Sequence, residues 1–466
     1  MQTSTGGSET LVPLLHHIGT RDGTLTKDAR MVNAMPEQAE VGKACVKRPG
    51  TVLSKTPAIA GKGQGMVDLA GIPYAIVKDT LQQINGSGSI TIPGVTTPDQ
   101  LYQTISNYAP GKSLIKSASG MWLLTAPNAI VKVTAAGYPT TTLPGVTMLD
   151  GTTYVMNAAD GTIAGSAVND PSSWNALNFI GADGLLGAGV GIERHLNYIV
   201  GCYDLGMQLF YDAANATGSP LAPVLNASWR TGVATAGSIV ELGDNFFCMS
   251  KAGPRGRSIL MFSGLQPTEI SNPYIDKILN RDSLVGVRSF GIRTAGHSFY
   301  LLTLDASNVS LVYDVTYQHW SVWTSSLTGV EAEFFAGSYL NSNGCDYLQD
   351  AVTGTVHCML PDAYTDSGSP IPVTIHTPPY DWGTLHRKLL PSLYLIADTV
   401  ATTVTMAWSD NDYATFSNGR TIALNTERKM LQRCGSSRRR SWRLTHSDNT
   451  SLRVYSLELE IALNVA

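Results

Sequence analysis

The segment from His297 to Trp323 reads HSFYLLTLDASNVSLVYDVTYQHWSVW and contains two strand-like runs separated by a turn. In the first run Phe299 and Leu301 alternate with two further apolar residues, and Asp305–Asn308 supplies turn-forming side chains. A sheet built from such strands has two apolar faces and cannot bury both alone. This segment therefore predicts sheets that stack, each covering the next.

Six other segments have the same strand–turn–strand pattern. The seven units begin at Tyr74, Met121, Thr153, Asn197, Asn245, Ser298 and Asp346, with spacings of about 47, 32, 44, 48, 53 and 48 residues. A period in the forties is typical of a four-stranded β-propeller blade. We therefore predict an all-β protein built on a β-propeller of about seven blades, with six or eight also possible, followed by a small C-terminal β-sandwich. A β-sandwich throughout is the alternative architecture.

The composition of the chain changes after the last of these units. The stretch PDAYTDSGSPIPVTIHTPPYDWG, from Pro361, is rich in Pro, Ser and Asp and is typical of a connector. Alternating patterns such as SLYLIADTV and RVYSLELEIAL follow it, whereas the first fifty residues show no regular period. We predict an extended N-terminal arm over residues 1–50, a propeller over 51–365 and a β-sandwich over 366–466.

The bulk composition argues against several classes of protein. Of 466 residues only 15% are charged, compared with about 25% in an ordinary soluble domain. The net charge of −4 does not fit a protein that wraps the outside of nucleic acid. No run of 18 apolar residues and no early positive charge occur, so we expect neither membrane insertion nor a secretory signal. Six scattered cysteines without a C-x-x-C pair predict reduced, mostly buried thiols.

Two glycine-containing motifs resemble nucleotide-binding sequences only in part. YAPGKS, ending at Ser113, lacks the first glycine of a phosphate loop, because Ser106 stands at that position. It predicts a turn. GLLGAGVGIE, from Gly184, has neither the glycine spacing nor the strand-to-helix context of a dinucleotide site. It predicts a crossing between blades.

Metal and catalytic signatures are also weak. WSDNDYATF offers Asp410 and Asp412 as oxygen ligands, but Thr415 stands where a calcium loop requires glycine. We predict a hairpin turn held by the Asp side chains. The nine histidines show no metal-ligand spacing beyond the His16–His17 pair, and no G-x-S-x-G motif occurs. We therefore predict no enzyme activity, no catalytic residues, no cofactor and no metal site.

The most highly charged stretch is ERKMLQRCGSSRRRSWRLTHSD, where seven of the sixteen residues 428–443 are basic. Alternation places Trp442 and Leu444 on one face with Arg440, and Arg439, Ser441 and Arg443 on the other. Pairing of the arginines with acidic groups, on the same or a neighbouring subunit, and contact with phosphate are the two interpretations. The first is favoured, because Arg is frequent at protein interfaces and no base-stacking aromatic residues interleave with the run.

Several segments, in order along most of the chain, share a pattern with one known family. They are ARMVNAMPEQAE with KRPGTVL, GIPYAIVKDTLQQI, TMLDGTTYVMNAADGTIAGSAVNDPSSWNALNF, GVATAGSIVELGDNFFCMS with LQPTEISNPYID, and WSDND with RCGSSRRRSWRLTHSD. Together they resemble the packaged-DNA stabilisation proteins, the tail hub or nozzle of short-tailed bacteriophages. The matching positions are Asn33, Pro36, Glu37, Pro49, Gly50, Asp150, Gly151, Ser166 and Trp174. The glycine usual after Asp412 is missing, which affects only the expected turn geometry.

The resemblance implies a structural virion protein that forms a six-fold ring beneath the portal and its adaptor. The ring would extend the DNA channel and retain the packaged genome. Its implied partners are further copies of the chain, the portal-adaptor protein, tail fibre, spike or needle proteins, and double-stranded DNA in transit. The protein would be made in the host bacterial cytoplasm and reside in the tail of the virion.

On this view the surface arginines contact a neighbouring subunit or the adaptor. These candidate interface residues are Arg433, Arg438, Arg439 and Arg443. A tail propeller that binds or cleaves host glycans and a DNA-binding module are the alternative functions.

Overall fold

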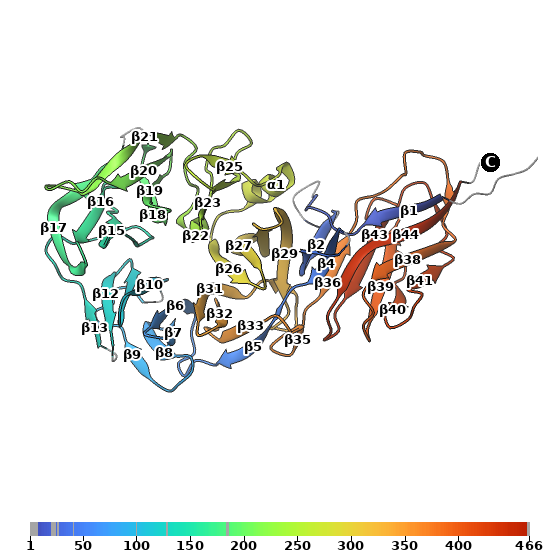
Figure 1. Ribbon diagram of the computed structural model, residues 1–466, viewed down its shortest axis with the longest axis horizontal. Coiled ribbons are helices and arrows are strands. Elements are labelled where there is room, and N and C mark those ends of the chain that lie inside the picture. Colours follow the sequence, from blue (N-terminus) through green and yellow to red (C-terminus); the bar gives the residue numbers. More distant parts are fainter. Residues whose placement is uncertain are drawn as a thin grey trace, which may run out of the picture. The chain divides into compact units, whose positions relative to one another are not determined.

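The computed structural model describes residues 8–19, 25, 28–40, 42–98, 100–126, 129–182 and 186–463 (Figure 1). Strands dominate, and one α-helix, α1 (Pro273–Arg281), occurs among the described residues, so the all-β prediction is confirmed. No described helix is long and apolar enough to cross a membrane. The chain divides into a propeller unit, Leu53–Ser307 with Phe335–Met359, and a sandwich unit, Met1–Val52 with Asn308–Phe334 and Leu360–Ala466.

Antiparallel sheets follow one another along the propeller unit (Figure 1). Five have four strands, in the orders β6-β7-β8-β9, β10-β11-β12-β13, β14-β15-β16-β17, β18-β19-β20-β21 and β22-β23-β24-β25. Within this unit β31, β32 and β33 add a sheet of three strands, and β26 and β27 add a hairpin. The described part of the unit therefore holds six sheets and one hairpin, and the predicted propeller is confirmed.

The strands of the propeller unit have the following bounds. They are β6 (Gly63–Leu69), β7 (Ile72–Val77), β8 (Thr80–Gln83), β9 (Ser89–Thr91), β10 (Gln103–Ala109), β11 (Lys112–Ser117), β12 (Gly120–Thr125), β13 (Ala129–Lys132), β14 (Thr147–Leu149), β15 (Thr152–Met156), β16 (Ile163–Ala167), β17 (Asp170–Ile180), β18 (Gly189–His195), β19 (Tyr198–Tyr203), β20 (Met207–Asp212), β21 (Leu221–Trp229), β22 (Val240–Leu242), β23 (Asn245–Met249), β24 (Ile259–Phe262), β25 (Pro267–Glu269), β26 (Arg288–Thr294), β27 (His297–Leu304), β31 (Ala336–Ser342), β32 (Cys345–Asp350) and β33 (Val356–Leu360).

Two-residue turns join the first and second strands of several sheets. Between β14 and β15 both Asp150 and Gly151 have positive φ, at 47° and 83°, as a type I′ hairpin requires. The same pairing of a positive-φ residue with glycine recurs at Ala70–Gly71, Ala295–Gly296 and Asn343–Gly344. The turn predicted for YAPGKS also forms, with Gly111 between β10 and β11.

Each sheet of the propeller unit buries side chains against the next sheet. One core cluster joins β6–β8 to β11 and β12, and further clusters join each following pair of sheets as far as β23 and β24. A separate cluster, including Met66 and Tyr347, packs the last sheet against the first. Buried Gln349 strengthens this closure, because its side chain donates to the Ile76 carbonyl at 3.0 Å and accepts from the Gly65 amide at 3.0 Å.

The sandwich unit consists of two sheets around a common apolar core. In one, β44 (Arg453–Leu463) pairs with β1 (Ser8–Pro13), β4 (Lys43–Lys47), β37 (Lys388–Leu389) and β38 (Ser392–Ala397); β3 (Ala34–Gln38), β41 (Met430–Gln432) and β42 (Ser436–Ser437) extend it. The other runs β28 (Val309–Asp314), β29 (His319–Ser325), β2 (Arg30–Val32), β36 (Val373–His376), β43 (Ser441–His446), β39 (Thr403–Ser409) and β40 (Arg420–Ala423). Short strands are β5 (Gly50–Lys55), β30 (Ala332–Glu333), β34 (Thr365–Asp366) and β35 (Ser369–Pro370).

This division of the chain differs from the predicted boundaries 1–50, 51–365 and 366–466. The N-terminal residues are not an extended arm in the described structure: β1 pairs with β44 over six residues, and Val12 and Leu14 lie in the common core. The segment Asn308–Phe334 also belongs to the sandwich unit. The strand partners are hundreds of residues apart in the chain, so local periodicity could not reveal them.

A buried arginine ties together the three segments of the sandwich unit. The Arg48 guanidinium donates to both carboxylate oxygens of Asp366, to the Thr324 carbonyl and to the side-chain oxygen of Asn33. Arg48 and Asp366 are fully buried, at 2.5 Å between Nη2 and Oδ2. Gly50 is required beside them, because a Cβ there would lie 2.3 Å from the Thr365 carbonyl oxygen. The Asn33 and Pro-Gly positions of the resemblance thus form a structural junction.

Replacing Asp366 by Asn is expected to lower the free energy of unfolding by about 3–5 kcal/mol, because it leaves the buried Arg48 charge without a counter-charge. Urea denaturation measures the change. Glu37→Gln is the matched control, since its ion pair with Arg453 is partly exposed and worth about 0–1 kcal/mol. Equal effects of the two substitutions would contradict this account of the junction.

The cysteines agree only in part with the expectation of reduced thiols. Cys45, Cys202, Cys248 and Cys434 are free and buried, as predicted. Cys345 and Cys358, by contrast, form a disulfide between the neighbouring strands β32 and β33. Antiparallel pairing brings these two residues together, and the separation of 13 residues alone did not indicate it.

Several histidines of the sandwich unit are held neutral by burial. Burial lowers the pKa of His16 and of His446 to about 4, and that of His319 and of His376 to about 3. Nearby positive groups lower these pKa values further, namely His17 and Lys43 beside His319, Arg30 and Arg443 beside His376, and Lys47 beside His446. The folded state therefore binds fewer protons at these residues than the unfolded chain does below pH 6.5.

The sandwich unit is accordingly expected to lose stability as the pH falls from 7 to 5. In this window the unfolded histidines take up protons while the folded ones stay neutral, so the free energy of unfolding decreases. Urea denaturation at pH 7, 6 and 5, followed by tryptophan fluorescence, measures the slope. His376→Gln should make the slope shallower. A stability that is constant or rises towards pH 5 would contradict the prediction.

Candidate functional site

The basic segment near the C-terminus lies partly on β43 in the sandwich unit. Strand β43 pairs with β39, with Trp442 opposite Trp408 and Ser441 opposite Ser409. Trp442, Leu444 and Arg440 are buried, as the alternation predicted. Of the residues predicted on the other face, Arg439 is exposed and Arg443 is half-buried, whereas Ser441 is buried.

Arg440 is a core residue rather than a surface contact. Its Nε and Nη2 donate to the two carboxylate oxygens of Asp410 at 2.6 and 2.7 Å, and Nη1 donates to the Cys434 carbonyl at 2.5 Å. The guanidinium lies 5.0 and 5.3 Å from the ring centres of Trp408 and Trp442. Every face of this cation is therefore engaged within the chain.

The two aspartates of WSDND lie against arginine side chains. This corrects the prediction that the aspartates hold the turn. Asp410 binds Arg440, and Asp412 lies 3.9 Å from Arg439. The turn is closed instead by Asn411, whose side-chain oxygen accepts from the Thr415 amide at 3.0 Å. Asp412 has φ of 62°, a conformation that Asp tolerates. No cluster of three metal-ligating side chains occurs among the described residues.

The four candidate interface arginines lie in two places. Arg439 and Arg443 are near the β39–β40 end, where the Arg443 guanidinium stacks 4.1 Å from the ring centre of Phe416. Arg433 and Arg438 flank the loop around Gly435 and are exposed, and Arg438 donates to the Leu385 carbonyl at 3.0 Å. Arg433 has φ of 56°, which is uncommon for a residue with a side chain.

Sequence reasoning missed the segment that packs beside this loop. Arg387 is exposed and donates from Nε to the Ser436 hydroxyl at 2.9 Å. Lys388 is buried and donates from Nζ to the carbonyls of Thr384, His386 and Arg438 at 2.6–2.8 Å. The Lys388 ammonium therefore holds the 384–388 loop against the backbone of Arg438. In the sequence, the basic triplet HRK at 386–388 was the only sign of this loop.

A groove of about 530 Å³ opens next to the same loop. It is lined by Leu389, Leu390, Pro391, Ser392, Tyr394, Met430, Gln432, Arg433, Gly435 and Glu460. The side chains of Leu389 and Tyr394 are partly exposed there. The groove combines apolar walls with an arginine at its rim, a combination typical of protein contacts.

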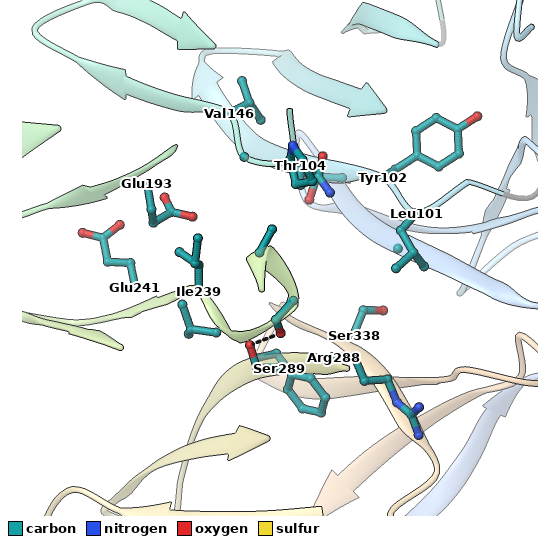
Figure 2. Close-up of a pocket in the computed structure, with 18 of the residues that line it drawn as sticks. Leu101, Tyr102, Thr104, Val146, Glu193, Ile239, Glu241, Arg288, Ser289 and Ser338 are labelled. Carbon is teal, nitrogen blue, oxygen red and sulfur yellow. Dashed lines mark hydrogen bonds between the residues drawn. The ribbon is translucent and has the colours of Figure 1, made fainter. Parts of the chain in front are cut away.

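A second cavity, of about 640 Å³, lies in the propeller unit between its inner strands (Figure 2). One strand from each sheet and from the hairpin lines it, namely β6, β10, β14, β18, β22, β26 and β31. Figure 2 shows Glu193 and Glu241 on one side of it. Burial raises the pKa of Glu193 to about 8, and Glu241 adds to this, so Glu193 is mostly uncharged at pH 7.

This cavity is too narrow for duplex DNA. One turn of B-DNA rises about 34 Å and is wider than its own ~12 Å major groove, so it occupies several thousand Å³, far more than the 640 Å³ of this cavity. Its lining also contains acidic residues, Glu193 and Glu241, beside the basic Arg194 and Arg288. The propeller cavity is therefore not a passage for DNA.

Comparison with known proteins gives one informative match. A family model described as "Bacteriophage P22 Gp10, beta-propeller" matches residues 13–357. No curated protein matches. Among solved structures, "Streptogramin B lyase structure" is similar at 10% identity, TM-score 0.43, over 66% of this chain and 95% of that one. BamB from Moraxella catarrhalis is similar at 11% identity, TM-score 0.37, over 75% and 97%. Likenesses of this size carry no argument about function.

Arg440→Ala is expected to lower the free energy of unfolding by about 2–4 kcal/mol, because it removes the hydrogen bonds to Asp410 and to the buried Cys434 carbonyl and the cation between two tryptophans. Urea denaturation followed by tryptophan fluorescence measures it. Arg439→Ala is the control: its ion pair is long and exposed, so the change should stay within about 1 kcal/mol. A larger loss of unfolding free energy for Arg439→Ala than for Arg440→Ala would show that Arg440 is not the arginine of this segment that stabilises the fold.

Proposed function

The chain belongs to the family of the bacteriophage P22 Gp10 β-propeller, the phage proteins that stabilise packaged DNA, and on this premise we propose that it forms part of a short phage tail. In this proposal several copies, six by the resemblance, assemble as a ring below the portal-adaptor. The ring extends the DNA channel and retains the genome. The protein is made in the bacterial cytoplasm and resides in the virion.

The family match over residues 13–357 is the observation that carries the proposal. It spans segments of both units, including Asn33, Arg48 and Gly50 of the buried junction. The match therefore covers almost all of the propeller unit and two of the three segments of the sandwich unit, and not a single motif; Asp366 and the segment Leu360–Ala466 lie beyond it.

The size of the propeller cavity supports a ring of several copies. Because the cavity is too narrow for a duplex, a single subunit offers no DNA path along its propeller axis. A channel would have to lie between copies, in an assembly whose head-to-tail contacts close on themselves. The net charge of −4 suits such a wall, since a strongly basic lumen would hold DNA by counterion release.

The proposal assigns the candidate arginines Arg433, Arg438, Arg439 and Arg443 to contact with a neighbouring copy or with the adaptor. The exposure of Arg433, Arg438 and Arg439 and the apolar groove beside Arg433 support this assignment; Arg443 is half-buried. Tail fibre, spike or needle proteins would be further partners, and double-stranded DNA would pass through the ring only transiently.

The purified protein, or the tail isolated from virions, is expected to give rings with six-fold symmetry in two-dimensional class averages by electron microscopy. The isolated protein should also show little salt-dependent affinity for duplex DNA, because the chain as a whole is acidic. A protein that stays monomeric and is absent from virion tails would contradict the proposal. Release of reducing ends from host polysaccharide would favour the glycan-cleaving alternative instead.

A further inference from the structure

One region of the sandwich unit is strongly basic in a chain that is acidic overall. Residues 380–446 contain ten Lys or Arg and five Asp or Glu, a net charge of +5, so the rest of the chain carries −9 to give the total of −4. Arg387, Arg433 and Arg438 are exposed within this region. Among the described residues, none of these three forms an ion pair.

An apolar groove lies beside these arginines: Arg433 lines it, and Arg387 and Arg438 lie on the loops next to it. Leu385 and Leu389 are exposed beside them, and the groove reaches Tyr394 and Met430. The strand register places Tyr394 opposite Met430, so these side chains share one face of the sheet. We call Arg387, Arg433 and Arg438 with Leu385, Leu389 and Tyr394 the basic surface. Buried Lys388 holds its loop in place through three carbonyls.

The propeller unit carries a region of opposite charge. Residues 150–212 contain seven Asp or Glu and one Arg, a formal net charge of −6, or about −5 at pH 7 because Glu193 is mostly uncharged. Asp150, Asp160 and Asp170 are exposed in turns of the β14–β17 sheet, and none of them forms an ion pair among the described residues. The turns of Asp150 and Asp170 adjoin, because the Asn169 amide donates to the Gly151 carbonyl.

Exposed apolar side chains accompany these carboxylates. They lie on or beside β17 and β21, the outermost strands of their sheets, which Figure 1 shows at the periphery of the propeller unit. Leu225 is 88% exposed and Leu177 is 70% exposed, and Val168 and Phe179 are also exposed. The stretches 171–180 and 221–229 contain no charged residue. We call Asp150 and Asp170 with Val168, Leu177 and Phe179 the acidic surface; Asp160 lies in the turn at the other end of the β15–β16 hairpin, and Leu225 lies on the neighbouring sheet.

We infer that the basic surface of one copy binds the acidic surface of a second copy of this chain. Each surface combines exposed apolar side chains with charges of one sign that form no ion pair among the described residues. The charges of the two surfaces are opposite in sign. Complementary charge steers association and fixes register, while the apolar groups supply buried area. The contact is heterologous, because it joins two different surfaces, and this is the type of contact that generates a ring.

The inference rests on the proposed ring and names the surfaces that close it. Two features favour a second copy over DNA as the occupant of the basic surface. Phosphates would not fill a groove walled by Leu389, Tyr394 and Met430, whereas leucine and phenylalanine side chains would. The acidic surface also lies on every copy, so each subunit supplies the partner that the next one requires.

Charge exchange tests the contact in the full-length chain. Arg433→Asp/Arg438→Asp and Asp150→Arg/Asp170→Arg are each expected to reduce ring formation at least tenfold at a fixed protein concentration. The combined variant, with all four substitutions, is expected to recover rings, because the charges are exchanged rather than removed. Negative-stain electron microscopy and native mass spectrometry count rings. Circular dichroism and the Tm establish that each variant is folded.

Lys62→Glu/Lys78→Glu is the matched control: both lysines are exposed in the propeller unit outside the two surfaces, and rings should form as in the unchanged protein. Rings that form normally in both charge variants would overturn the inference. The inference would also be overturned if both charge variants fold and lose rings but the combined variant does not recover them. It would be overturned too if the variants form intact rings that fail only to bind another tail protein. If the unchanged protein forms no ring, the proposed function itself fails.

Discussion

The architecture depends on one constraint: a β-sheet with two apolar faces must be covered on both sides. In the propeller unit each sheet meets this requirement by packing on its neighbours, and the last sheet packs on the first through Met66 and Tyr347. Buried Gln349 bridges the same junction with two hydrogen bonds to the backbone of the first sheet. In the described part of the unit these contacts bury the inner faces of the sheets from β6 to β24 and join the last sheet to the first, and a cavity remains between the inner strands.

The sandwich unit meets a different requirement, because its strands come from three separate segments of the chain. Two buried arginines fix this unit: Arg48 joins the three segments, and Arg440 ties together loops within the last one. Arg48 joins the segments through Asp366, Thr324 and Asn33, and Arg440 fixes the loop after β41 through Asp410 and the Cys434 carbonyl. Both cations have their donors paired, which is the condition under which burial of a charge is tolerated.

Three exposed arginines, Arg387, Arg433 and Arg438, form no ion pair among the described residues, and they lie on or near the loops beside an apolar groove. Asp150 and Asp170 lie at the end of a sheet whose outer strand exposes leucine and phenylalanine side chains. The ring that we propose would require strong contacts between copies and weak contacts with the duplex. Opposite charges on the two inferred contact surfaces, with a net charge of −4 overall, would satisfy both requirements.

Local pattern in the sequence determined the class of fold, because alternation, turn residues and the period of the units are properties of neighbouring residues. It likewise indicated that Arg440 shares the face of Trp442. The tertiary structure alone decided that β1 pairs with β44, that Asn308–Phe334 belongs to the sandwich unit, and that Arg387 lies beside the loop of Arg433. These facts depend on contacts between residues far apart in the chain, and such contacts leave no periodic signal in a single sequence.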